Sequence, residues 1–200
     1  GERNINATQC NGRNTLTVEG YVEAEYLLRQ QIPVIMDFLR RVAPGFENIT
    51  LKSTSTALGV RETRRFIGDY VLCDQDIEHA GRHEDVVVHK AWFLIDIHNP
   101  AGGGQAEKRA QPATPYDIPY RSLLPKDVEG LLLSGRNISG THRAHASYRV
   151  MGVALATGQA AGMAAALSAK EGCTPRQLDY HKVQDALKDY GAQLFKEDEE

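Results

Sequence analysis

Cysteine is scarce in this chain of 200 residues, and the cysteines that are present form no recognisable motif. Cys10, Cys73 and Cys173 lie far apart, and no CxxC pair occurs. This spacing argues against a zinc ribbon or a disulfide framework and is typical of a reducing compartment. The first residues, GERNINATQC, also lack the basic segment and the apolar run of a signal peptide. We therefore expect a cytoplasmic protein.

Charge of one sign is not in excess over the whole chain. The sequence has 23 lysines and arginines against 26 aspartates and glutamates, a formal net charge of -3. It has neither the basic balance nor the aromatic platform of a nucleic-acid-binding protein, so no nucleic-acid partner is expected. One long interval, between Glu129 and Glu171, contains no carboxylate at all. Five arginine or histidine side chains lie within it: Arg136, His142, Arg143, His145 and Arg149.

Long hydrophobic runs are also lacking, although one uncharged segment has the length of a membrane span. Residues 150–169 carry no formal charge and include the GxxxG pair Gly158 and Gly162. Most of these residues are glycine, alanine, serine, threonine or glutamine, which contribute little to transfer into lipid. We expect no membrane contact here but a buried helix, from about Val150 to Lys170, whose small side chains let a flat ligand or a backbone approach.

The first half of the chain shows clear periodicity. Apolar residues at helical spacing predict a helix over 17–43, capped by Thr17 and kinked or split in two at Pro33. Three kinds of element are expected between this helix and residue 116: strands over 51–72 and 85–98, a short capped helix from Asp74, and an exposed mobile loop over 101–115.

The second half predicts a strand, a glycine, a loop and a helix in succession. A short buried strand over 130–134 ends at Gly135, and a loop over 136–148 leads to the small-residue helix. In α/β proteins this order directs the helix N-terminus toward a ligand, and an anion is favoured there. Cations alone at that end are unfavourable by about 0.3 to 1 kcal/mol. Their counter-charge comes either from a ligand or from carboxylates elsewhere in the chain. After the small-residue helix, a last helical region is expected, capped at Thr174.

Metal binding is an alternative chemistry for part of this interval. His142 and His145 are three residues apart and face the same way on a helical turn. No carboxylate or cysteine at the usual spacing completes a ligand set. We therefore expect no metal site.

Six ordered motifs give a more specific indication: LGVRETRR, IDIH, IPYRSLLP, GLLLSGRNIS, ASYRVM and GQAAGMAAA. Over residues 17–194 they resemble the carboxyl-terminal part of a family of FAD-dependent oxidoreductases with the FAD/NAD(P)-binding fold. The resemblance implies a mixed α/β (α+β) fold. A mainly antiparallel substrate-domain sheet, within residues 1–115, would be followed by the strand and helix that return into the flavin domain, within residues 116–200.

The same resemblance implies FAD as the cofactor and identifies a set of residues that contact it. Gly135 and Arg136 would lie by the ribityl or pyrophosphate region, and residues 147–151 would present backbone N–H groups to the N1/O2 edge of the flavin. The full predicted set is Gly135, Arg136, Ser139, Ser147, Arg149, Val150, Met151 and Gly158.

For the substrate, the resemblance indicates His98, Arg61 and Arg64. A histidine titrates in the range needed to accept the proton released when a hydride leaves the substrate for flavin. The two arginines match a small polar or anionic organic substrate. Structural alternatives remain open: a histidine hydrogen-bonded in a core or turn for His98, and arginines that pair with other charges across a sheet.

One motif of such flavoproteins is missing, because the sequence contains no GxGxxG turn to hold the pyrophosphate. We therefore expect a carboxyl-terminal fragment, inactive and weak in FAD binding by itself, whose partner is the absent amino-terminal segment of the flavin domain. Apolar surface left uncovered at that edge is expected to favour association, including homo-oligomers. The alternative function is a non-catalytic structural or interaction module derived from a flavoprotein.

Overall fold

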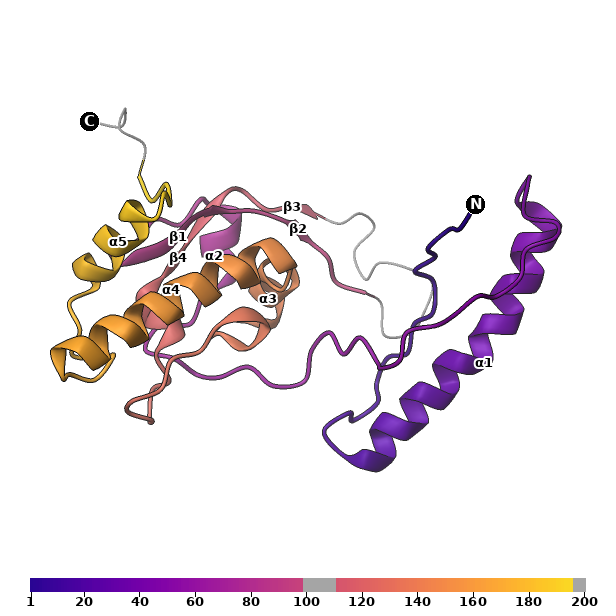
Figure 1. Cartoon of the computed structure of the whole chain (residues 1–200), viewed down its shortest axis with the longest axis horizontal. Helices are drawn as coiled ribbons and strands as arrows, with labels where there is room; N and C mark the ends of the chain where they lie inside the picture. Colours follow the sequence, from indigo (N-terminus) through magenta and orange to yellow (C-terminus); the bar gives the residue numbers. More distant parts are fainter. Residues whose placement is uncertain (99–110, 196–200) are drawn as a thin grey trace. The chain divides into compact units, whose positions relative to one another are not determined.

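The computed structural model describes residues 1–98 and 111–195, and the chain forms two compact units, Gly1–Thr63 and Arg64–Glu200 (Figure 1). The predicted boundary between residues 115 and 116 does not coincide with this division. Strand pairing crosses that position within the second unit, between Val86–Ala91 and Tyr116–Pro119. The assignment of substrate and flavin regions to 1–115 and 116–200 stays a prediction.

The first unit is built around one helix, α1 (Val18–Val42). Thr17 caps it as predicted, its side chain accepting a hydrogen bond from the Gly20 backbone N–H. The predicted split at Pro33 is wrong, because the helix continues through this residue without interruption. Side chains of α1 hold the flanking segments beside it: the Tyr21 hydroxyl accepts a hydrogen bond from the Leu58 N–H at 3.1 Å.

The second unit mixes helices with short strands. In chain order it contains α2 (Asp74–Glu78), β1 (Val86–Ala91), β2 (Leu94–Ile95), β3 (Gln111–Pro112), β4 (Tyr116–Pro119), the 3-10 helices η1 (Tyr120–Leu123) and η2 (Gly135–Asn137), α3 (His142–Tyr148), α4 (Met151–Glu171) and α5 (Tyr180–Asp189). This agrees with the predicted mixture of helix and antiparallel sheet.

Both sheets among the described residues are two-stranded and antiparallel. β1 pairs with β4, and β2 pairs with β3. The β1–β4 register is interrupted near Lys90, whose φ of 52° is left-handed. Its N–H donates to the buried carboxylate of Asp117, which also lies 2.8 Å from the His89 Nδ1 atom. Asp117 therefore stabilises a bulge that the strand pattern alone does not indicate.

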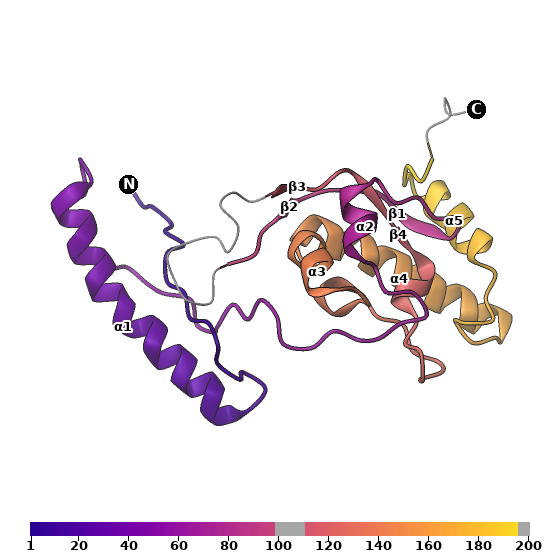
Figure 2. The ribbon, with the colours of Figure 1, turned by 180° about the vertical axis from the view of Figure 1, so that it is seen from behind.

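The core of this unit lies where α4 and α5 pack on β1 and on each other, and both views show α4 beside the β1–β4 pair (Figures 1 and 2). The side chains that fill it are fully buried and include Val86, Ile118, Ala160, Val183 and Leu187. Burial of each larger aliphatic chain contributes about 1.5 to 3 kcal/mol. Gln184 adds polar anchors from α5, donating to the Glu84 and Val86 carbonyls at 2.7 and 3.1 Å.

The helix α4 follows the predicted bounds closely. By length and composition it is apolar enough to cross a membrane, but this is weak support for a span because the core helix of a water-soluble fold meets the same test. Its buried face comprises Val153, Thr157, Ala160, Ala164 and Ser168. The predicted small-residue stripe, which includes Gly158 and Gly162, lies on the other side, where an added Cβ would meet no atom within 4 Å.

The predicted strands over 51–72 and 130–134 are wrong. Residues 51–72 contain only single bridges, at Gly68 and Leu72, because the N–H groups of residues 66–72 bond to carbonyls in and next to η1 and η2 and not to a neighbouring strand. Residues 131–134 run beside η1 with the Leu133 N–H bonded to the Leu123 carbonyl. The β-branched and aromatic residues of the first segment favour an extended backbone, but neither segment finds a ladder partner.

Three other expectations need revision or fall outside the described residues. The predicted loop over 136–148 contains α3, which Thr141 caps through a bond from the Ala144 N–H. Asp179, not Thr174, caps the last helix. Most of the predicted mobile loop over 101–115 lies outside the described residues, and its end forms β3.

One titratable side chain in α3 belongs to the core. His145 is only 2% exposed and packs edge-on against the Tyr148 ring. Burial, together with the smaller effect of the nearby guanidinium groups of Arg65 and Arg149, lowers its pKa from 6.5 to about 4. The folded chain therefore holds this imidazole neutral.

We expect this burial to make folding sensitive to acid. His145 favours the folded state fully above pH 6.5, and this contribution of about 3 kcal/mol is lost as the pH falls from 6.5 toward 4, because only the unfolded chain takes up the proton there. Urea unfolding followed by circular dichroism across this range should show a smaller pH dependence in His145→Gln. The exposed His79→Gln is the control. An equal pH dependence in wild type and His145→Gln would contradict the assignment.

A second prediction concerns close packing at Gly140. An added Cβ would lie 2.6 Å from the Cε1 atom of Tyr148, whose hydroxyl donates to the Ile138 carbonyl. Gly140→Ala should therefore lower the free energy of unfolding by about 1 to 3 kcal/mol. The matched control is Gly158→Ala, which meets open space within a helix and should stabilise the chain by up to about 1 kcal/mol. Equal effects in urea unfolding would show that the Tyr148 contact is unimportant.

Candidate functional site

Four of the predicted cofactor residues, Ser147, Arg149, Val150 and Met151, lie where α3 ends and α4 begins. Arg149 is the C-cap of α3 and Val150 is the N-cap of α4. A short helix such as α3 is marginal by itself, so its position depends on tertiary contacts. The Thr141 hydroxyl, which caps α3, also donates to the Asp74 carboxylate of α2 at 2.7 Å. Only Arg149 and Val150 separate the end of α3 from the start of α4, and the N-terminus of α4 lies at this junction.

Carboxylates from other segments supply part of the counter-charge that the basic interval lacks. Arg143 bonds to Glu78 at 2.8 and 3.1 Å and lies 3.9 Å from Asp74. Arg149 bonds to the Asp96 carboxylate at 2.8 Å. Of the two sources that the sequence left open, the remote carboxylate is therefore correct for these two arginines.

The N-terminus of α4 itself is not sealed by these ion pairs. Val150 provides no side-chain cap, whereas α1, α3 and α5 are each capped by a side-chain oxygen. Met151 is 84% exposed, and Gly152 is exposed as well. The first N–H groups of α4 and its macrodipole therefore favour an electronegative ligand at an open surface.

Gly135 lies next to this helix, at the start of η2. Its φ of 74° is left-handed, and its N–H donates to the Thr157 hydroxyl of α4 at 2.9 Å. Thr157 in turn donates to the helix backbone. The exposed Arg136 follows directly. The geometry thus places Gly135 and Arg136 beside α4, and their predicted place by the ribityl or pyrophosphate region stays a prediction.

Ser139 and Ser147 have no exposed surface. Ser147 lies within α3, where its hydroxyl donates to the Phe93 carbonyl at 2.9 Å and accepts from the Tyr116 hydroxyl at 3.0 Å. Burial raises the pKa of Tyr116 to about 12, which keeps this phenol protonated as a donor. Both serines are buried in this arrangement, and their predicted contact with the flavin stays a prediction.

The predicted substrate residues are only partly brought together. The His98 Nε2 atom lies 3.3 Å from the Asp96 carboxylate that also binds Arg149. A predicted catalytic residue and a predicted cofactor residue therefore share one neighbour. Arg64 is exposed at the start of this unit, and Arg61 is exposed in the first unit.

Asp96 is a site residue that the sequence analysis did not identify. The signal was present in IDIH, because residues two apart in an extended chain lie on the same face. Its partner Arg149 is more than 50 residues away, so no local pattern indicates the ion pair.

The structure does not bring the histidine pair of α3 into a metal site. His142 is exposed whereas His145 is buried. Within residues 1–98 and 111–195, no group of three His, Cys, Asp or Glu side chains is placed to hold a metal.

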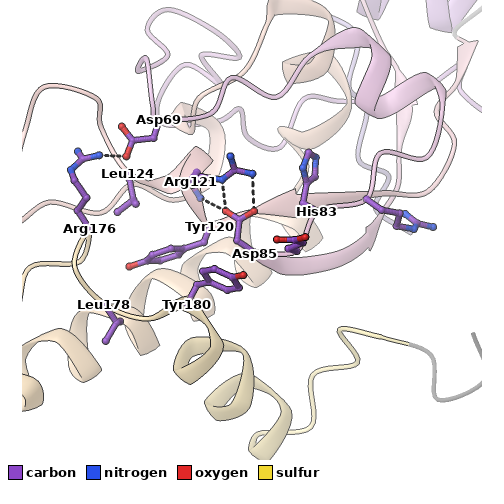
Figure 3. Close-up of a pocket in the computed structure, with 11 residues that line it drawn as sticks. Asp69, His83, Asp85, Tyr120, Arg121, Leu124, Arg176, Leu178 and Tyr180 are labelled. Atoms are coloured by element: carbon purple, nitrogen blue, oxygen red, sulfur yellow. Dashed lines mark hydrogen bonds and ion pairs between the residues drawn. The ribbon is translucent and has the colours of Figure 1, made fainter. Parts of the chain in front are cut away.

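A separate pocket of about 560 Å³ opens between η1, the start of β1 and the segment before α5 (Figure 3). Figure 3 shows Arg121 facing Asp85, with bonds of 2.9 and 3.1 Å, and Arg176 bonded to Asp69. Arg82, also in the lining, pairs with the buried Asp117. The arginines of this pocket are thus paired with carboxylates of the chain itself, and nothing in the pocket calls for an anionic ligand. The candidate site therefore remains at α4.

Comparison with known protein families is consistent with the geometry at α4. Residues 1–187 match the family described as FAD dependent oxidoreductase. No curated protein and no solved structure shows significant similarity to the chain. The family match covers most of the sequence, including every residue of the candidate site, and it confirms the resemblance and the cofactor. The chain belongs to the FAD-dependent oxidoreductase family.

Proposed function

We propose that this chain supplies the carboxyl-terminal part of a flavin site, in an enzyme that transfers a hydride between a small polar or anionic organic substrate and FAD. The observation that carries the proposal is the open, uncapped N-terminus of α4 beside Gly135. The N-termini of α1 and α5, by contrast, are each capped by the side chain of the N-cap residue. In a family that uses FAD, an uncapped and exposed helix pole is a fitting place for the cofactor.

The residues at this pole fit the chemistry of a flavin. Backbone N–H groups of Met151 and its neighbours can donate to ring oxygens, and the exposed Arg136 can approach a phosphate. Gly158 leaves open space along α4, and Arg149 fixes the position of Val150. When bound, FAD supplies the two-electron acceptor that amino-acid side chains lack.

The chain's own contribution to the chemistry is proposed to be a proton acceptor and a binding surface. His98 would take the proton of a hydroxyl or amine next to the C–H bond that breaks. Arg61 and Arg64 are proposed to bind the polar or anionic group of the substrate. Both guanidinium groups lie at exposed positions, which such a role requires.

We further propose that the partner of this chain is a segment with the GxGxxG turn, which the sequence does not contain. Exposed apolar side chains on α4 support a covering partner, since Met151 and Leu155 are 84% and 76% exposed. We propose a homo-oligomer because of the same exposed apolar side chains. We propose a cytoplasmic location because the three cysteines are free thiols. A closed, non-catalytic module is less well supported, because such a module would cover these side chains.

A third prediction is that this chain alone binds FAD weakly. Mixing equimolar chain and FAD at micromolar concentrations should leave the flavin absorbance and fluorescence nearly unchanged, because no glycine-rich turn holds the pyrophosphate. Adding the segment with that turn should quench the fluorescence. Quenching to completion by the chain alone would show that the α4 pole and its neighbours suffice.

A fourth prediction concerns His98 in the intact enzyme. His98→Ala should slow flavin reduction by substrate about 100-fold or more, whereas the dissociation constant for FAD should change little, because the side chain acts on the substrate proton. Stopped-flow absorbance measures the first quantity and flavin fluorescence the second. The exposed His79→Ala is the control. Equal losses in both quantities would remove His98 from the catalytic residues.

A further inference from the structure

A single carboxylate oxygen connects the proposed proton acceptor to the start of the flavin-facing helix. The Oδ2 atom of Asp96 accepts a hydrogen bond from Arg149 Nη2 at 2.8 Å and lies 3.3 Å from His98 Nε2. Asp96 is thus the carboxylate that bonds to Arg149 at the junction of α3 and α4 and also lies next to His98, the histidine proposed for catalysis.

The arginine side of this contact is firmly held. Arg149 Nη2 also donates to the main-chain carbonyl of Asp96 at 3.0 Å, so the guanidinium binds both the backbone and the side chain of one residue. The side chain of Arg149 is only 14% exposed. Hydrogen bonds between charged groups at such partly buried positions are stronger than neutral ones and fix geometry.

A second bond holds the same helix end to the same strand. The Ser147 hydroxyl of α3 donates to the Phe93 carbonyl just before β2. With Arg149 bonded to Asp96 just after β2, the two ends of this strand are tied to the last turn of α3. The end of β2 and the beginning of α4 therefore keep a defined relation to one another.

The histidine side depends on Asp96 more directly. His98 lies two residues further along an extended chain, on the same face as Asp96. A carboxylate next to an imidazole commonly selects the ring orientation and decides which nitrogen carries the proton. In this arrangement the orienting carboxylate is itself held by the residue that precedes the N-cap of α4.

We propose that Asp96 is a positioning residue, which fixes the His98 imidazole relative to the N-terminus of α4 by sharing one carboxylate oxygen between His98 and Arg149. This inference rests on the proposed function only for the catalytic role of His98. The coupling of the three side chains is a property of the chain and is measurable without cofactor.

The test begins with the full 200-residue chain in solution. Three-bond Hα–Hβ couplings in NMR spectra, with the His98 signals assigned by His98→Gln, report whether its side chain keeps one χ1 rotamer. We expect one rotamer in the wild type and averaging in Asp96→Ala. Asp96→Asn, which keeps the shape but removes the charge, should shift the couplings in the same direction by a smaller amount and guards against unfolding of the alanine variant.

The matched control is Glu78→Gln. It removes a carboxylate bonded to Arg143 of the same helix without touching His98. The control should leave the His98 couplings unchanged. A single rotamer that persists in both Asp96 variants, or averaging that is equally large in Glu78→Gln, would overturn the proposal.

Kinetics of the intact, FAD-loaded enzyme separate this inference from the proposed function. Asp96→Ala should lower the rate constant of flavin reduction at saturating substrate about 100-fold, with less than about threefold change in KM and in FAD affinity, because misplacement of a reacting group slows chemistry more than binding. If His98→Ala leaves reduction unchanged while Asp96→Ala still mobilises His98, the positioning role holds and the proposed function fails. If His98→Ala is slow and Asp96→Ala is not, the positioning role fails.

Discussion

The ion pair between Arg149 and Asp96 is the interaction on which the candidate site depends. It joins a strand end to the residue between two helices, and it does so through both the side chain and the backbone of Asp96. Both side chains are mostly buried, and breaking such a pair by removing one partner costs more than the net stabilisation that the pair provides. The ion pair thereby holds the junction of α3 and α4 at the end of β2, next to His98.

The basic interval between Glu129 and Glu171 shows two different solutions to the same electrostatic problem. Arg143 and Arg149 are neutralised by Glu78 and Asp96, and His145 avoids charge altogether because burial lowers its pKa to about 4. The pole of α4 is treated differently, because it has no capping side chain and remains exposed. Under the proposed function, this open pole faces the FAD that the family uses.

The extended segment before α2 illustrates how a correct local tendency can give a wrong element. Its N–H groups bond to two separate stretches of the chain: Phe66 and Leu72 to Asn137 and Ser139, and Asp69 and Tyr70 to Leu124 and Arg121. Within this segment, β-bridges form only at Gly68 and Leu72, with Pro125 and Gly140. A regular ladder cannot form under these conditions, even though β-branched and aromatic residues favour an extended backbone.

The sequence by itself determined the long elements and the family. The periodicity and caps of α1, the small-residue composition of α4 and the apolar run of β1 are local properties, and six motifs in order sufficed for the likeness to FAD-dependent oxidoreductases. Only the tertiary structure decided that α3 exists, that Ser147 is used in the core and that Asp96 connects His98 to Arg149. These features depend on contacts between residues some 30 to 70 positions apart, which a local pattern does not encode because each partner is an ordinary residue until the fold brings it near the other.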